Sequence, residues 1–139
     1  MSAGAIAPGS SFEVLLDPVL LPDIVRYAGA SGDFNPSHYD AEVAVAAGFK
    51  TNFAQGMLTA GLLGVVVAER LGPGALRGFG VRFVAPLFCG DQPKVQGRVV
   101  SVEDGRARLD LVVVAGGAPV LTGWAEIAVE SPETASGRV

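Results

Sequence analysis

The pattern of hydrophobic and polar positions predicts helices in the first half of the chain. Between residues 21 and 30, apolar side chains recur at the spacing of one helix face, at Leu21, Ile24, Val25 and Ala28. Residues 56–71 are apolar on nearly every side, which indicates a helix enclosed by other elements. The glycines and the proline of residues 72–74 predict the end of that helix.

Residues 33–36, Asp-Phe-Asn-Pro, have the composition of a turn, because the residue before a proline is disfavoured in a helix. Proline suits the first turn of a new helix, so we expect a short helix over residues 36–47 that Gly48 closes. A loop over residues 49–55 then leads to the long apolar helix.

The second half of the chain has the pattern of β-strands. Segments rich in Val, Leu and Phe alternate partly between apolar and polar positions, and turn residues separate them. These segments cover residues 78–85, 94–102, 107–115 and 120–129. Together with a short strand at residues 12–16, they predict an antiparallel meander. The fold class is therefore α+β, with a sheet of about five strands wrapped around the long helix.

Length and composition bound the organisation of the protein. A chain of 139 residues fits one domain with a single core. We place that domain at residues 11–130, because residues 1–10 and 131–139 carry few side chains that could pack and are expected to be flexible tails. Hydrophobic residues make up 50% of the chain and charged residues only 17%, so the apolar surface left over predicts an oligomer.

Charge and rare residues argue against several classes of function. The net charge is −4 and the ten Lys and Arg residues are scattered, so no nucleic-acid partner is expected. One cysteine and one histidine offer neither an internal disulfide nor a Cys/His metal site, and no cofactor is expected. The longest apolar run, residues 57–68, falls short of the ~20 residues that cross a bilayer. Residues 1–11 have no Lys or Arg before an apolar stretch, so they do not have the pattern of a secretory signal. We expect a cytoplasmic protein with no membrane partner.

Residues 27–40 hold the densest group of chemically active side chains. Asp33 and His38, the chain's one histidine, are separated by an Asn-Pro turn. The turn allows both side chains to face one pocket and one water, where a carboxylate and an imidazole can act as general acid and base. Addition of water to a double bond needs such a pair. The alternative is that Asp33 and Asn35 only shape the turn, while His38 is a polar residue of the first helical turn.

A second candidate site lies where the long apolar helix begins, at Gln55, Gly56 and Met57. The amides at a helix N-terminus are unpaired and carry partial positive charge, so they can stabilise an oxyanion. Glycine would let a substrate carbonyl come close. The alternative is an ordinary helix start in which Gly56 serves packing.

Together these segments resemble a known family. Residues 27–38, with Ser31-Gly32-Asp33-Phe34-Asn35-Pro36 followed by His38, are similar to the signature of MaoC-like (R)-specific enoyl-CoA hydratases and the related (3R)-hydroxyacyl-ACP dehydratases. Residues 47–49, residues 55–59, and residues 81–83 with Pro86 and Gly90-Asp91 resemble later family segments in the same order. The resemblance extends over about residues 12–129.

The resemblance implies a hot-dog fold, in which an antiparallel sheet wraps a long central helix, and a hydro-lyase acting on acyl-CoA or acyl-ACP. It implies that Asp33 and His38 activate the water and that Asn35 supports them. Gly56 would offer its amide to the thioester oxygen, with Gln55 and Met57 beside it in the substrate site. Gln55 departs from the pattern, because many members have histidine there and glutamine exchanges no protons near neutral pH.

Two other functions remain open beside the hydro-lyase. The hot-dog fold also hosts acyl-CoA thioesterases, and fold alone does not fix chemistry. The chain could also be a non-catalytic subunit that shapes the acyl channel of a partner. The pair of Asp33 and His38 argues against both. The expected assembly is a homodimer, or a heterodimer with a related hot-dog subunit.

Overall fold

The computed structural model of the protein describes residues 6–129. Its elements are β1 (Ser11–Leu15), α1 (Leu21–Ser31), the 3-10 turn η2 (Pro36–His38), α2 (Ala41–Ala46), α3 (Gly56–Leu71), β2 (Leu76–Phe83), β3 (Lys94–Glu103), β4 (Arg106–Ala115) and β5 (Ala118–Ala128). The long helix predicted at residues 56–71 is confirmed at both ends, and the predicted strands are confirmed to within about two residues.

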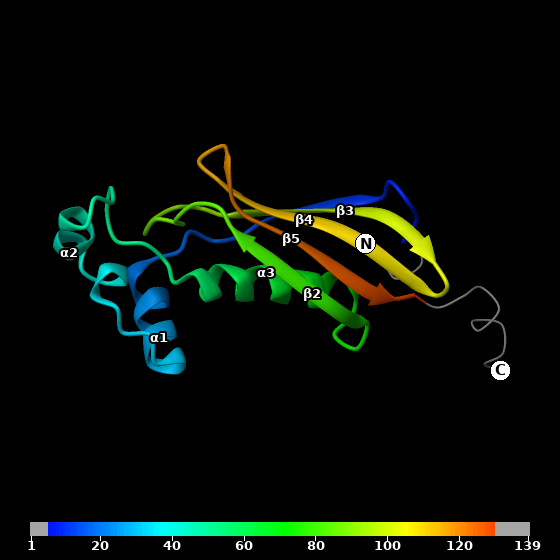
Figure 1. Ribbon diagram of the computed structural model, residues 1–139, viewed down its shortest axis with the longest axis horizontal. Helices are drawn as coiled ribbons and strands as arrows, with labels where there is room; N and C mark the ends of the chain where they lie inside the picture. Colours follow the sequence, from blue (N-terminus) through cyan, green and yellow to red (C-terminus); the bar gives the residue numbers. More distant parts are fainter. Residues whose placement is uncertain (1–5, 130–139) are drawn as a thin grey trace.

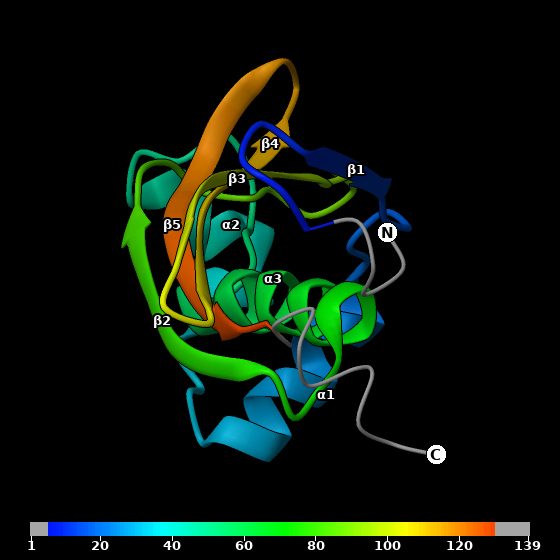
Figure 2. The ribbon, with the colours of Figure 1, turned by 90° about the vertical axis from the view of Figure 1, so that its right-hand side faces the viewer.

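The strands form one antiparallel sheet in the order β1-β3-β4-β5-β2. This sheet curves around α3, and α1 lies on the other side of that helix (Figure 2). In Figure 1, α1 and α2 lie together at the end of the molecule where α3 begins. The α+β prediction and the hot-dog arrangement are both confirmed.

The predicted meander is correct only for β3, β4 and β5. Two-residue turns with positive φ join these strands, at Asp104-Gly105 (φ 51° and 73°) and at Gly116-Gly117 (φ 60° and 78°). Such turns match the twist of a hairpin. In contrast, β2 pairs with β5 and lies at the sheet edge. Residues 84–93 are long enough to cross the sheet, so β2 need not pair with β3, and the meander prediction was wrong there.

Helix α3 packs one face on the sheet and leaves another face open. Leu63 and Val67 are fully buried on the inner face, against a core that includes Val95, Val99, Leu109, Leu121 and Ile127. On the other side, Met57 is 60% exposed and Val65 is 56% exposed. The prediction of a helix enclosed on all sides was therefore wrong for a single chain, because neither the sheet nor α1 covers this face.

The predicted helix over residues 36–47 is broken in two. The 3-10 turn η2 ends at His38, and α2 begins only at Ala41. The break occurs because the Asp40 side chain accepts hydrogen bonds from the amides of Glu42 and Val43, at 3.0 and 3.3 Å. Asp40 is thus the N-cap of a new helix, and an N-cap residue has non-helical backbone angles.

Part of the predicted N-terminal tail is hydrogen-bonded to the sheet. The Gly9 amide donates to the Val99 carbonyl at 2.8 Å, and the Val99 amide donates to the Ser10 carbonyl at 2.8 Å. Residues 1–5 and the predicted tail 131–139 lie outside the described residues. The domain bounds 11–130 stay a prediction.

Two glycines give a paired prediction about the stability of the fold. An added Cβ at Gly123 of β5 would lie 2.6 Å from the Gly80 carbonyl oxygen on the neighbouring strand, whereas one at Gly61 of α3 would meet nothing within 4 Å. We expect Gly123→Ala to lower the free energy of unfolding by about 1–3 kcal/mol. Gly61→Ala should leave it unchanged or raise it by up to about 1 kcal/mol. Urea unfolding at one fixed protein concentration, followed by the fluorescence of Trp124, measures both; equal midpoints would contradict the close strand approach.

Candidate active site

The turn after α1 brings the two predicted catalytic side chains together. Gly32 ends α1 in the left-handed conformation, with φ 78°, and its amide donates to the Ala28 carbonyl. The chain then reverses through Asn35 and Pro36 into η2. As a result, Nε2 of His38 lies 3.5 Å from Oδ2 of Asp33. The sequence offset alone could not fix this distance, which the turn provides.

The backbone of Phe53 fixes the orientation of the His38 ring. Nδ1 of His38 lies 2.9 Å from the Phe53 carbonyl oxygen. A carbonyl oxygen can only accept, so Nδ1 carries the proton and donates it. In the neutral ring the free lone pair is therefore on Nε2, the nitrogen that faces Asp33. The Phe53 ring also packs edge-on against the imidazole, with centroids 5.0 Å apart.

The two catalytic candidates differ in exposure. The side chain of His38 is 10% exposed, whereas that of Asp33 is 48% exposed. At 3.5 Å, Nε2 and the carboxylate are too far apart for a good hydrogen bond. In the neutral ring both groups are acceptors, so a water that donates one hydrogen to each is the natural bridge between them. The site can thus hold and polarise one water at the surface of the chain.

Asn35 has a role within the turn itself. Its Oδ1 accepts from the amide of Ser37 at 3.1 Å and from the hydroxyl of Ser37 at 2.8 Å. The amide of Asn35 in turn donates to Oδ1 of Asp33 at 3.3 Å. Asn35 therefore caps the turn, as the alternative interpretation of this segment predicted. Its amide also holds the carboxylate of Asp33 in place. The two interpretations of this segment are compatible.

The three candidate residues at the start of α3 differ in their burial and in their contacts. Gly56 is the first helical residue, and an added Cβ there would lie 3.0 Å from the Phe83 ring. Gln55 is 1% exposed and donates through Nε2 to the Ile24 carbonyl of α1 at 3.1 Å, while its buried Oε1 has no hydrogen-bond partner among residues 6–129. Met57 points outward and is 60% exposed.

The helix start and the pair of Asp33 and His38 belong to one end of the molecule. Phe53, whose carbonyl holds His38, is three residues before Gly56. Three Cα–Cα steps limit the distance between Phe53 and Gly56 to about 11 Å. Figure 1 shows the segment that leads into α3 beside α1 and α2. The amides of the α3 N-terminus therefore lie within reach of a substrate that contacts the pair.

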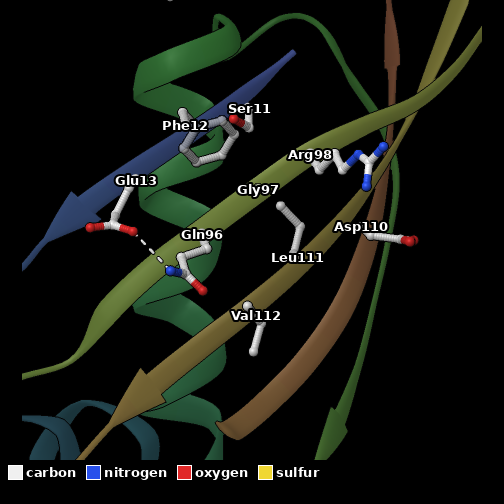
Figure 3. Close-up of a pocket in the computed structure, with 9 residues that line it drawn as sticks. All are labelled: Ser11, Phe12, Glu13, Gln96, Gly97, Arg98, Asp110, Leu111 and Val112. Atoms are coloured by element: carbon white, nitrogen blue, oxygen red, sulfur yellow. Dashed lines mark hydrogen bonds between the residues drawn. The ribbon is translucent and has the colours of Figure 1, made fainter. Parts of the chain in front are cut away.

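A hollow on the sheet is a separate feature. Figure 3 shows its lining residues on the face of β1, β3 and β4 away from α3. The hollow has a volume of about 510 Å³. It is lined by Glu13, Gln96, Arg98, Asp110 and Val112, with Ser11, Phe12, Gly97 and Leu111. No residue predicted for the site lines this hollow, so it is not the candidate active site.

Sequence reasoning missed the residues that hold His38. The Phe53 contact is made by a backbone carbonyl, which leaves no mark in the amino-acid sequence. Asn52 was also missed, although its side chain is buried and bonded to the His38 carbonyl. A polar residue within a short loop is usually exposed, so only the tertiary contacts distinguish Asn52 from an ordinary loop asparagine.

Comparison with known proteins agrees with this arrangement. The family model described as "MaoC like domain" matches residues 6–119. A 3-hydroxybutyryl-CoA dehydratase from Methylorubrum extorquens is 36% identical over 127 residues, which are 88% of this chain and 81% of the relative. An R-hydratase structure from Pseudomonas aeruginosa has a TM-score of 0.83 and 32% identity, covering 93% of this chain and 85% of that one. The (R)-hydratase of Aeromonas caviae has a TM-score of 0.83 at 26% identity, covering 91% and 98%.

The hot-dog fold and the names of these relatives define the class as an enzyme, a lyase of the hydratase and dehydratase kind. The chain belongs to the MaoC-like dehydratase family. The resemblance noted from the sequence is confirmed. The prediction of a hydro-lyase is confirmed at the level of the reaction class.

Three further observations concern membranes, metals and the cysteine. Within residues 6–129, each helix is too short or too polar to span a bilayer. The same part of the chain contains no group of three or more His, Cys, Asp or Glu side chains that could hold a metal ion. Cys89 is a free thiol of intermediate burial.

Proposed function

We propose that this protein adds water to trans-2-enoyl-CoA thioesters and catalyses the reverse dehydration of (3R)-3-hydroxyacyl-CoA. The observation that carries the proposal is the 3.5 Å approach of His38 Nε2 to the Asp33 carboxylate, with the ring held so that Nε2 can accept a proton. The names of the relatives support a CoA thioester as the substrate and (R) as the product configuration.

The proposed chemistry follows from these groups. A water held between Asp33 and His38 loses a proton to the pair as its oxygen bonds to C3 of the substrate. The electrons of the C2=C3 bond move towards the carbonyl, and the negative charge grows on the thioester oxygen. The Gly56 amide at the start of α3 stabilises that oxygen. A proton then returns from the pair to C2, and dehydration follows the same path in reverse.

A direct spectrophotometric assay, run together with detection of free thiol, tests the proposed hydratase against a thioesterase and a non-catalytic subunit. Crotonyl-CoA loses its conjugated-enoyl absorbance on hydration, whereas a thioesterase would release a free thiol. We expect rapid loss of absorbance without thiol release, and chiral analysis should give (3R)-3-hydroxybutyryl-CoA. Thiol release would identify a thioesterase instead. No turnover of crotonyl-CoA, longer enoyl-CoA or crotonyl-ACP by folded protein would favour a non-catalytic subunit.

We also propose that the chain forms a homodimer. The outer edge of β2 has no strand beside it within residues 6–129, and unpaired strand edges favour association. Exposed apolar side chains lie nearby, with Phe83 54% and Val84 53% exposed. Burying them against a second copy would cover apolar surface that one chain leaves open.

Native mass spectrometry tests this assembly. We expect twice the 14.2 kDa mass of the chain for the wild type. Val84→Lys should shift the population towards monomer, because it places a charge in the buried contact. Val100→Lys is the matched control, since Val100 is 51% exposed on β3, away from the β2 edge. A folded wild-type monomer would contradict the homodimer and point to a different partner chain.

A further inference from the structure

The buried side chain of Asn52 is bonded to the catalytic histidine by a contact that the reaction scheme above does not use. Asn52 is 7% exposed. Its Nδ2 donates to the backbone carbonyl of His38 at 2.9 Å, and its Oδ1 accepts from the hydroxyl of Thr51 at 3.2 Å. The His38 carbonyl fixes which end of the Asn52 amide faces it, because a carbonyl oxygen can only accept and so requires the NH₂ group.

Asn52 and its neighbour Phe53 hold His38 at two points. The side chain of Asn52 binds the His38 carbonyl, and the carbonyl of Phe53 binds Nδ1 of the ring. Only two rotatable bonds, Cα–Cβ and Cβ–Cγ, separate the His38 backbone from its ring. Because both ends are bonded to consecutive residues of one segment, the direction of Nε2 towards Asp33 is fixed.

This segment is itself anchored to the connection between β2 and β3. The carbonyl of Asn52 accepts from the Cys89 amide at 3.0 Å, and the Ala54 amide donates to the Leu87 carbonyl at 2.8 Å. Leu87 is 2% exposed and belongs to the core. The two contacts to His38 therefore start from a part of the chain that the core holds in place.

His38 needs such support because its own element is short. The turn η2 has three residues, and His38 is the last of them. No strand pairing reaches this turn in residues 6–129. A single 3-10 turn has poorer hydrogen-bond geometry than an α-helix. Without contacts from elsewhere, the ring would sample several rotamers, and a small misplacement of a catalytic group is costly to the rate.

We propose that Asn52 is a positioning residue, which fixes the backbone of His38 so that the ring keeps its Nδ1–H bond to Phe53 and presents Nε2 to Asp33. This inference rests on the proposed hydration reaction for its effect on rate. Its structural part, the effect on the ring, can be measured without any substrate. A merely structural role would affect stability but leave the state of the ring unchanged.

The ring can be observed directly, because the chain contains one histidine. With ¹⁵N-labelled histidine, NMR at a pH where the ring is neutral reports which nitrogen carries the proton. We expect one dominant Nδ1–H tautomer in the wild type. In Asn52→Leu, which has a similar shape and no donor, the spectrum should shift towards the mixed tautomers of an unrestrained imidazole. Thr51→Val should keep the wild-type spectrum, because it leaves the bond between Asn52 and His38 in place.

Kinetics give the second readout. We expect Asn52→Leu to lower kcat for crotonyl-CoA hydration by about 10- to 100-fold with little change in KM, as loss of a supporting contact does around other catalytic groups. Gln92→Leu, which removes a side-chain bond to the Leu16 carbonyl elsewhere in the fold, should retain wild-type kcat. If Asn52→Leu does not fold, Asn52→Asp keeps the size and the acceptor for Thr51 but loses the donor to His38.

The outcomes separate this inference from the proposed function. An unchanged tautomer and unchanged kcat in a folded Asn52 variant would overturn the positioning role. So would a lower stability with the wild-type tautomer retained, since Asn52 would then be structural only. If the wild type hydrates no enoyl thioester, the proposed function fails, while the tautomer comparison still decides whether Asn52 positions the ring.

Discussion

Replacing Asp33 with asparagine is expected to lower kcat for crotonyl-CoA hydration by about 10²- to 10⁴-fold, the range that general acid–base groups supply. Asparagine keeps an oxygen that can accept the 3.3 Å bond from the Asn35 amide, so the turn should persist. What it loses is the negative charge and the basic oxygen facing His38. Stopped-flow or steady-state absorbance of the enoyl thioester measures the effect.

A second carboxylate serves as the control for Asp33→Asn. Asp110 is exposed on β4, where it lines the hollow on the far face of the sheet. Asp110→Asn removes the same charge from the protein and should retain wild-type kcat. If Asp33→Asn kept full activity while folded, Asp33 would be only a turn residue, as the capping alternative holds, and His38 would need a different partner.

His38→Asn is expected to reduce kcat by a similar factor of about 10²–10⁴. The amide nitrogen of asparagine can take the place of Nδ1 and donate to the Phe53 carbonyl, which lies 2.9 Å from Nδ1 in the wild type. The variant thus keeps the contact that holds the segment but has no group at the position of Nε2. Loss of activity in a folded variant would assign the proton transfer to Nε2.

The double variant, Asp33→Asn with His38→Asn, tests whether the two side chains act as one unit. Groups that act as one unit are strongly non-additive. If Asp33 and His38 hold one water together, the double variant should be about as slow as the slower single variant. Additive losses would instead show that the two side chains act in separate steps. Circular dichroism and thermal unfolding of each variant confirm that the fold is intact before rates are compared.

Much of the fold could be predicted because it depends on local chemistry. Helix α3 has an apolar stretch with a glycine at its start and Gly72 at its end, and both bounds were predicted. The hairpins joining β3, β4 and β5 follow from adjacent turn residues that accept positive φ. In these cases the residues that decide the structure are neighbours in the sequence.

The errors over the pairing of β2 and over the covering of α3 arose where distant contacts decided the outcome. Strand β2 pairs with β5 because the connection over residues 84–93 carries the chain across the sheet, and no local signal gives its destination. The break before α2 was locally encoded by Asp40, but the turn-forming proline at residue 36 also suits a continuous helix. Whether α3 is covered on all sides depends on what packs against it, which its own sequence does not state.

The amino-acid sequence by itself determined the hot-dog class, the long helix and the candidate pair of Asp33 and His38, because composition, turn residues and the family motif are local properties. The tertiary structure alone decided the 3.5 Å approach of that pair, the protonated nitrogen of the ring and the support from Asn52 and Phe53. The last two features depend on Asn52 and Phe53, which lie 14 and 15 residues from His38 and fold back onto it. Backbone carbonyls are common to every residue, so only the folded chain shows which one a side chain will meet.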